Sequence, residues 1–131
     1  MDGKKIFVFS GKSGSGKTYQ LKKIANNQYA RYFHADELLD MIIHCGEYAN
    51  TNLASLFLSS GATMFAFDDI DYELEGKTQC QEELCRAIWN LVKHGCRIAM
   101  GVVNIEKVPA IKQFLTSSQT AGFVSWEVLY L

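Results

Sequence analysis

Short apolar runs alternate along this chain with longer segments in which apolar residues recur every three or four positions. The runs are rich in residues that favour strands, and each is bounded by glycine or polar residues. They predict strands over 5–10, 31–35, 63–67, 97–103 and 123–131. The segments between them have the periodicity of amphipathic helices. They predict helices over 16–27, 37–45, 52–59, 78–94 and 107–115.

Local signals set the expected ends of several helices. Asp36 is a good N-cap for the second helix, and Gly46 is expected to end it. Thr78 and Gln81 have the spacing of a capping box, in which each side chain bonds the other residue's backbone. Pro109 is compatible with a helix only in its first turn.

The order of these elements predicts the fold class. Strands that are apolar throughout and alternate with helices are typical of a parallel sheet buried on both faces. The chain has 131 residues, so we expect one domain spanning 1–131. In such α/β folds, ligands bind beyond the carboxyl ends of the strands. The residues that follow each strand are therefore the ones to examine for chemistry.

Composition excludes several classes of function. Lys and Arg number 13 and Asp and Glu number 14, which gives a formal net charge of −1. Such a balance provides no overall attraction to DNA, RNA or an anionic membrane, so direct DNA binding is not expected. No apolar run approaches the roughly 18 residues of a membrane span, and the N-terminus does not resemble a signal peptide. We expect a cytoplasmic protein.

The cysteines offer no metal site. Cys45, Cys80, Cys85 and Cys96 form no Cys-x-x-Cys pair, and no neighbouring histidine completes a zinc pattern. We expect four reduced thiols that are mostly buried as small apolar side chains.

A glycine-rich segment directly follows the first predicted strand. Residues 11–18 read Gly-Lys-Ser-Gly-Ser-Gly-Lys-Thr, the complete pattern of a phosphate-binding loop. Glycines let the backbone turn its N–H groups toward an anion, and the following helix adds its positive end. Lysine reaches the β- and γ-phosphates, and threonine offers a hydroxyl to Mg²⁺. The residues expected to hold the nucleotide are Gly11, Ser13, Gly14, Ser15, Gly16, Lys17 and Thr18.

Acidic and amide side chains follow the third and fourth predicted strands. We expect Asp68, with Thr18, to hold Mg²⁺ through its water shell, and Asp69 to orient or deprotonate the attacking water. Asp71 is given no role. Asn104 would lie at the end of the neighbouring strand, where it could hold the same water; asparagine is also a common turn residue. The expected catalytic residues are thus Lys17, Asp69 and Asn104.

These motifs together resemble one family. The chain, over about 4–128, is similar to the AAA+ ATPase core of the bacterial replication initiator DnaA and its relatives, the helicase loader DnaC and the Hda-type regulators. The resemblance rests on the phosphate loop and on the segments 32–38, 67–70, 76–77 and 81–84, followed by Asn104. It implies a three-layer P-loop NTPase with helices on both faces of a five-stranded parallel sheet of order 5-1-4-3-2. It also implies ATP and Mg²⁺ as ligands and Asn104 as the sensor 1 residue.

The sequence departs from the family at several points. Residues 115–119 read Leu-Thr-Ser-Ser-Gln where the family carries an arginine finger, and no arginine follows Arg97. Only residues 1–4 precede the first strand, and the chain stops at 131, where the family's helical lid would begin. A finger contributes about 10³ to 10⁵ in turnover. We therefore expect nucleotide binding of modest affinity and slow hydrolysis.

The expected function is that of a Mg·ATP-binding P-loop ATPase with a role in replication initiation or its regulation, binding ATP and ADP. Two alternatives remain open. The chain could be a non-catalytic partner that docks on a full-length AAA+ protein or on its own copies through the shared subunit face. It could also be a small P-loop kinase, although kinases usually carry lid arginines after the fourth strand. Tyr19, Tyr29, Tyr32 and Phe33 are interpreted as structural aromatics.

Overall fold

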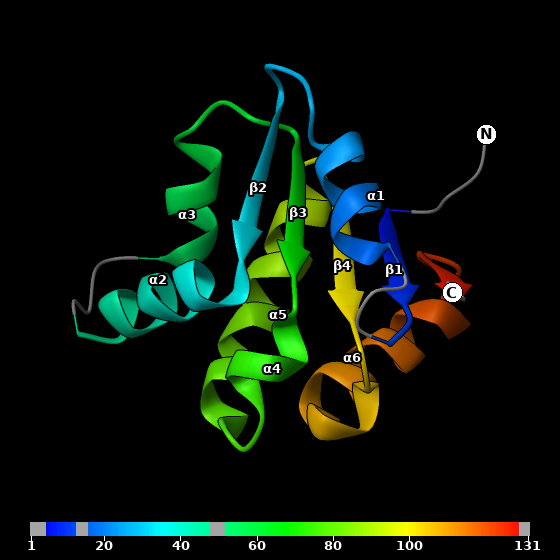
Figure 1. The fold of residues 1–131 in the computed structure, drawn as a ribbon. Coiled ribbons are helices and arrows are strands. Elements are labelled where there is room, and N and C mark those ends of the chain that lie inside the picture. Colours follow the sequence, from blue (N-terminus) through cyan, green and yellow to red (C-terminus); the bar gives the residue numbers. More distant parts are fainter. Residues whose placement is uncertain (1–4, 13–15, 48–51, 129–131) are drawn as a thin grey trace.

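The computed structural model describes residues 5–12, 16–47 and 52–128 (Figure 1). Its strands are β1 (Ile6–Ser10), β2 (Ala30–His34), β3 (Met64–Asp68), β4 (Arg97–Val102) and β5 (Val124–Val128). Its helices are α1 (Lys17–Ile24), α2 (Ala35–Glu47), α3 (Leu53–Leu58), α4 (Ile70–Leu74), α5 (Thr78–Lys93) and α6 (Pro109–Thr120), with a 3₁₀ turn η1 (Ile105–Lys107).

The strands form one parallel sheet in the order β2-β3-β4-β1-β5. The predicted α/β class is confirmed, and β1, β4, β3 and β2 lie in the predicted order, with β5 paired to β1. Because the strands are parallel, all of their carboxyl ends lie at one edge of the sheet. Ser10 is opposite Val102, and His34 is opposite Asp68. The segments that follow β1, β3 and β4 therefore leave the sheet as neighbours.

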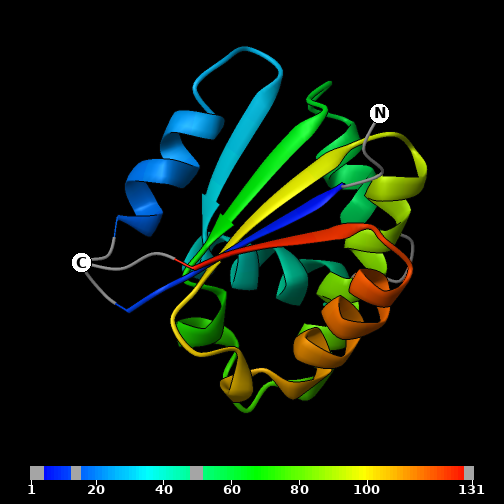
Figure 2. The same cartoon turned by 90° about the vertical axis from the view of Figure 1, so that its right-hand side faces the viewer.

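The helices are divided unequally between the two faces of the sheet (Figure 2). Of the helices that the structure describes, only α1 packs against one face, where it contacts β2, β3 and β4. The others lie on the opposite face. Alternation along β3 places Phe65 and Phe67 in the larger core and Ala66 beneath α1. Asp68, two residues after Ala66, falls on the α1 side of the sheet.

The larger core holds most of the buried apolar surface. Its centre is a group of tilted aromatic rings in which Phe57 contacts Phe33, Phe65 and Phe67 at centroid distances of 5.3, 5.3 and 5.4 Å. The buried face of α5 completes it, with residues at the helical spacing predicted from the sequence: Leu84, Ile88, Leu91 and Val92. Each fully buried side chain of this size stabilises the fold by about 1.5–3 kcal/mol.

Small residues let α1 approach the sheet closely. Leu21 packs on Ala66 and Ala99, and all three are fully buried. Gly101 continues this strip on β4. A Cβ atom added to Gly101 would lie 2.8 Å from both Asp68 Oδ1 and Leu21 Cδ1. The absence of a side chain at this position therefore lets Asp68 lie buried beneath the first turns of α1.

Gly101→Ala is expected to lower stability by about 1–3 kcal/mol, because the added methyl group would force a shift of Asp68 and Leu21, which are both fully buried. Chemical denaturation of the two proteins measures the difference. An unchanged unfolding midpoint would show that α1 shifts freely and that the close approach has no structural importance.

Several helix ends differ from the predictions. Helix α2 continues through Gly46 to Glu47, and it begins at Ala35, so Asp36 lies in its first turn instead of capping it. The capping box is wrong. Lys77 is the N-cap residue of α5, and no side chain caps that helix. The Gln81 side chain is instead buried between α4 and α6, where it donates to the Leu74 carbonyl and accepts from the Ala110 N–H.

The remaining differences concern short elements. Helix α1 ends at Ile24, three residues before the predicted end, and α6 runs from Pro109 to Thr120. The short α4 and η1 were not predicted, because five and three residues are too few to show a helical period. The predicted last strand includes residues 129–131, which lie outside the described residues.

The cysteines behave as structural thiols. Cys85 and Cys96 are buried, Cys45 and Cys80 are partly buried, and all four are free. Burial raises the pKa of Cys85 to about 12, so this thiol is not a nucleophile at neutral pH. Within the described ranges, no group of three or more His, Cys, Asp and Glu side chains is arranged around a common metal position. No helix in those ranges is long and apolar enough to cross a membrane.

Candidate nucleotide-binding site

The glycine-rich segment leaves β1 at the carboxyl edge of the sheet. The Gly11 N–H donates to the Val102 carbonyl at 3.1 Å, which fixes the start of the segment beside β4. Gly16 has φ +96°, a value that suits glycine, and α1 begins at the next residue. Ser13, Gly14 and Ser15, which we expect to contact phosphate, lie outside the described residues. The strand-loop-helix context predicted for this motif is present on both sides of them.

Lys17 is the first residue of α1 and is only 5% exposed. Its Nζ donates to the Lys12 carbonyl at 3.3 Å, so the ammonium group lies beside the first part of the glycine-rich segment. A buried lysine directed at a glycine-rich turn is suited to bind an anion held by that turn.

The Asp68 carboxylate is fully buried at the end of β3. Its Oδ2 accepts hydrogen bonds from Thr18 Oγ1 at 2.7 Å and from Tyr32 Oη at 2.6 Å. Its Oδ1 is buried and has no hydrogen-bond partner among the residues that the structure describes. Removing a carboxylate from water costs several kcal/mol unless positive charge compensates it. Two hydroxyl groups compensate only part of that cost.

Tyr32 was not predicted as a site residue. Partial burial, together with the hydrogen bond to Asp68 and the negative charge of that carboxylate, raises the tyrosine's pKa well above its ordinary value. The hydroxyl therefore remains protonated and donates to Asp68 at any physiological pH. Tyr32 also contacts α1, because Lys22 Nζ lies 5.3 Å from the centroid of the Tyr32 ring. At this distance the lysine and the ring form a cation–π contact.

Asp69 has an unusual backbone. Its φ of +53° and ψ of +39° are left-handed, and it is the only non-glycine residue with positive φ in the described ranges. Asp and Asn tolerate this region better than other residues, at a cost of order 1 kcal/mol. The conformation turns the chain directly from β3 into α4. It also brings Asp69 Oδ2 within 3.1 Å of His34 Nε2.

His34, the last residue of β2, bridges two carboxylates. Its Nδ1 lies 2.8 Å from Asp36 Oδ1 and its Nε2 faces Asp69. Partial burial alone would lower the pKa of His34, but the hydrogen bonds to Asp36 and Asp69 and their charges outweigh it, so the pKa is raised. The hydrogen bond from His34 correspondingly lowers the pKa of Asp36.

This pair of shifts predicts how stability depends on pH. Because the folded-state pKa of His34 lies above the value near 6.5 of an unfolded chain, its contribution is fully present below that value. The contribution is lost as pH rises through the folded-state pKa. Asp36 acts in the opposite sense, and its contribution disappears as pH falls through its lowered pKa. Unfolding free energies of wild type and His34→Gln should therefore differ most in mildly acidic buffer and converge above the folded-state pKa. A constant difference across pH would contradict this.

Asn104 follows β4 as predicted, but its side chain forms a hydrogen bond within the turn that comes next. Its Oδ1 accepts from the Glu106 N–H at 3.0 Å and caps η1. Its backbone N–H donates to Asp71 Oδ2 at 2.8 Å. The cap uses the amide oxygen, which leaves the Nδ2 hydrogens as the donors that Asn104 can offer to a ligand.

The structure thus brings Lys17, Thr18, Asp68 and Asp69 to one edge of the sheet and adds Tyr32 and His34 to them. A signal for these two was present in the sequence. Residues two apart on a strand share a face, so Tyr32 and His34 point to the same side of β2. Parallel pairing of β2 with β3 places His34 opposite Asp68.

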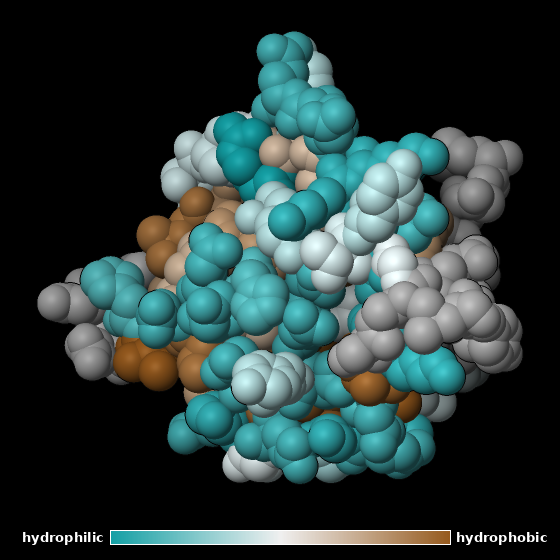
Figure 3. Space-filling view, viewed as in Figure 1, coloured by the Kyte–Doolittle hydropathy of each residue, from teal (hydrophilic) through white to brown (hydrophobic). Residues whose placement is uncertain are grey.

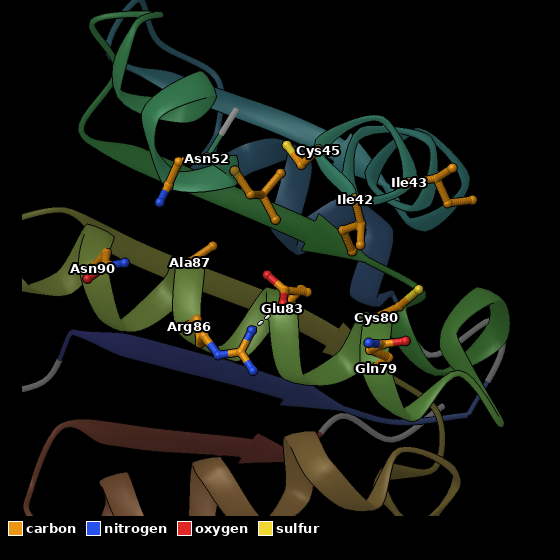
Figure 4. Close-up of a pocket in the computed structure, with 11 residues that line it drawn as sticks. Ile42, Ile43, Cys45, Asn52, Gln79, Cys80, Glu83, Arg86, Ala87 and Asn90 are labelled. Carbon is orange, nitrogen blue, oxygen red and sulfur yellow. Dashed lines mark hydrogen bonds and ion pairs between the residues drawn. The ribbon is translucent and has the colours of Figure 1, made fainter. Parts of the chain in front are cut away.

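A hollow lies away from this edge. It has a volume of about 510 Å³ between α2, α3 and α5, where Glu83 and Arg86 form an ion pair on one wall (Figure 4). Apolar side chains of α2, including the half-exposed Ile43, border it, and an apolar region is visible at the left of the surface in Figure 3. It includes none of the residues around Asp68, and we assign it no ligand.

The parallel sheet, its strand order and the helices around it match the fold of solved P-loop NTPases. Domain III of the replication initiator DnaA from Thermotoga maritima has this fold, with a TM-score of 0.74 and 19% identity over 95% of this chain. AMPPCP-bound DnaA from Aquifex aeolicus gives a TM-score of 0.69 and 21% identity over 94%. The DnaC helicase loader gives 0.64 and 18% over 98%.

The likeness establishes the fold. This chain spans 54% of the Thermotoga domain and 40% of the Aquifex protein, against 80% of the DnaC chain. No protein-family model and no curated protein matches the sequence. The AAA domain of FIGL-1 and a katanin structure also share the fold, with TM-scores of 0.57 and 0.53.

Proposed function

We propose that this chain binds Mg·ATP at the carboxyl edge of its sheet and hydrolyses it slowly, as a P-loop ATPase of the DnaA type. The observation that carries the proposal is the contact between Thr18 and Asp68. These residues are 50 positions apart in the sequence, yet Thr18 Oγ1 lies 2.7 Å from Asp68 Oδ2 at the start of the helix that follows the glycine-rich loop. A hydroxyl and a carboxylate beside a phosphate-binding loop are the protein ligands expected for a phosphate-bound divalent cation.

The donor set fits Mg²⁺. Both groups are hard oxygen ligands, and Asp68 is a buried carboxylate that has no ion-pair partner among the described side chains. When bound, Mg²⁺ would neutralise charge on the β- and γ-phosphates and supply the positive charge that this carboxylate lacks. Tyr32 would keep Oδ2 correctly oriented throughout, because its hydroxyl donates to the same oxygen. Mg²⁺ prefers to keep several waters, which agrees with only two protein ligands.

Binding of the phosphates is assigned to the loop. The N–H groups of Ser13, Gly14, Ser15 and Gly16 would donate to the β-phosphate, while Gly11 fixes the start of the loop through its bond to Val102. Lys17 would exchange the Lys12 carbonyl for phosphate oxygens. An anionic acceptor adds the attraction of opposite charges to the lysine hydrogen bond. Little side-chain entropy would be lost on binding, because Lys17 is already buried and hydrogen-bonded to the Lys12 carbonyl.

Water activation is assigned to Asp69. Its carboxylate would accept a proton from, or orient, the water that attacks the γ-phosphate, and Asn104 would hold that water through its Nδ2 hydrogens. His34 holds Asp69 in place by its hydrogen bond and competes with the water for Oδ2. Residues 115–119 contain no arginine that could supply positive charge to the transition state, and the proposed turnover is therefore slow.

The biological role is proposed from the relatives alone. The structures of similar fold include a replication initiator bound to AMPPCP and single-stranded DNA and a helicase loader. A role in replication initiation or its regulation is consistent with these neighbours. Direct DNA binding is not part of the proposal, because the chain has no net positive charge.

A second candidate function is favoured by the same lack of arginine. A chain that binds nucleotide but completes no catalytic site could act as a partner of a full AAA+ protein, with the nucleotide controlling the docking. Titration of a DnaA-type ATPase with this chain distinguishes the two candidates. A change in that enzyme's turnover favours the partner, whereas the absence of both co-elution and any change counts against it.

The proposed ATPase activity is tested by phosphate release from Mg·ATP with purified wild type and Thr18→Val. Valine preserves the shape of threonine and removes the hydroxyl. Release above the buffer rate in wild type, and at the buffer rate in Thr18→Val, supports the proposal. Equal release by both proteins would mean that the phosphate release does not depend on the Thr18 hydroxyl and comes from a contaminant. That result would refute the proposal.

A further inference from the structure

Asp71 is a buried acid to which neither the sequence motifs nor the proposed chemistry assigns a task. It lies in the first turn of α4, two residues after Asp69, and is 3% exposed. A carboxylate so deeply buried is retained only when strong hydrogen bonds compensate for the lost hydration. The identity of its partners therefore indicates what it does.

Both carboxylate oxygens of Asp71 bind the backbone that follows β4. The Val103 N–H donates to Oδ1 at 3.1 Å, and the Asn104 N–H donates to Oδ2 at 2.8 Å. These are charge-assisted bonds, about twice as strong as bonds between neutral groups. A side chain of the turn after β3 thus holds two consecutive amides of the turn after β4, 32 and 33 positions later in the chain.

Sheet pairing does not supply this link. The register between β3 and β4 ends with Phe67 opposite Met100, before either turn begins. Beyond that point Asp69 and Asn104 leave on separate turns. The two hydrogen bonds to Asp71 connect the turn after β3 with the turn after β4, beyond the last paired residues of the two strands.

We propose that Asp71 is a positioning residue that fixes the Asn104 turn against the Asp69 turn. It touches no substrate, and it sets the spacing between the two groups assigned to the attacking water. The part of this inference that concerns catalysis rests on the proposed function. The part that concerns the turn can be tested without nucleotide. A displacement of about 1 Å in such a pair can cost up to about a hundredfold in rate.

Gln81 provides a matched control. It is also fully buried and also forms two hydrogen bonds with the backbone, to Leu74 and Ala110. Its two hydrogen bonds connect α4 to the start of α6, and neither of them involves a residue of the two turns. Gln81→Met should lower stability, because it also removes two buried hydrogen bonds to the backbone. It should leave turnover unchanged.

The test measures the effect of Asp71→Asn twice. It is introduced once into the wild-type protein and once into the Asn104→Ala variant. Asparagine has the shape of aspartate, but its amide group turns a donor toward one of the two N–H groups, so one bond is lost. We expect turnover to fall by roughly tenfold to a hundredfold, with Mg·ATP affinity changed less than about twofold. In the Asn104→Ala background the same change should have an effect of less than about twofold. An equal fall in both backgrounds, or an equal fall in Gln81→Met, overturns the proposal.

A measurement without nucleotide separates this inference from the proposed function. In ¹H–¹⁵N spectra, the amide protons of Val103 and Asn104 should resonate downfield in wild type and move in Asp71→Asn, while that of Ala110 stays. Unmoved signals would overturn the inference even if the chain hydrolyses ATP. A wild type that binds no Mg·ATP would refute the proposed function and the catalytic part of the inference, while the shifts would still decide whether Asp71 holds the turn.

Discussion

Lys17→Ala is expected to weaken binding of Mg·ATP by about tenfold to a hundredfold. The lysine is buried against the loop and would form charge-assisted hydrogen bonds to the phosphates. Such bonds contribute about 1.5–3 kcal/mol, which corresponds to this range of affinity. Isothermal titration calorimetry measures both proteins directly. The fold should be unaffected, because the lysine's hydrogen bond to the Lys12 carbonyl is a single one and alanine favours helix.

Lys23→Ala is the matched control for that titration. Lys23 lies on the same helix and is exposed, so the change removes the same charge without touching the loop. Its affinity should remain within about twofold of wild type, because exposed charges contribute little. Equal weakening in both variants would mean that net charge, and not the loop, attracts the nucleotide.

Asp69→Asn is expected to reduce phosphate release by about 10²–10⁴, the usual contribution of a general base. Asparagine tolerates the left-handed backbone that Asp69 adopts, so the variant should fold normally. It cannot accept a proton, and its amide retains only part of the contact with His34. Mg·ATP affinity should be nearly unchanged, since Asp69 is not assigned to the phosphates. Single-turnover phosphate release, with calorimetry on the same samples, separates the two effects.

Asp36→Asn controls for the loss of a charged partner of His34. It weakens the other side of the same bridge and leaves Asp69 intact. We expect its turnover to change by less than about threefold. If Asp36→Asn lowers release as strongly as Asp69→Asn does, the charge on His34, and not the Asp69 carboxylate, controls the reaction.

The parallel architecture could be predicted because the apolar pattern is strong. Residues 97–102 and 64–67 are apolar almost throughout, and only a sheet covered on both faces buries such strands. Helix ends were less predictable, because a cap depends on where a side chain finds its partner. Gln81 has capping-box spacing, yet it bonds Leu74 and Ala110, residues that only the tertiary structure brings near.

The residues of the candidate site could be proposed from the sequence where they lie in one local motif. Lys17 and Thr18 follow from the loop pattern, and Asp68 follows from an apolar strand that ends in an acid. Tyr32 and His34 required strand pairing, and Asp71 required the position of a turn 32 residues away. Their spacing along β2 places Tyr32 and His34 on one face of the strand, but which residues they contact depends on the packing of distant segments.

The most direct test of the account is calorimetric titration of wild type with ATP, in the presence of Mg²⁺ and in the presence of EDTA. The account predicts saturable binding of one nucleotide per chain with Mg²⁺ and markedly weaker binding without it, because the buried Asp68 carboxylate would otherwise face the phosphates uncompensated. Absence of binding in both conditions, or equal binding in both, would contradict the assignment of Thr18 and Asp68 to a cation and with it the central claim.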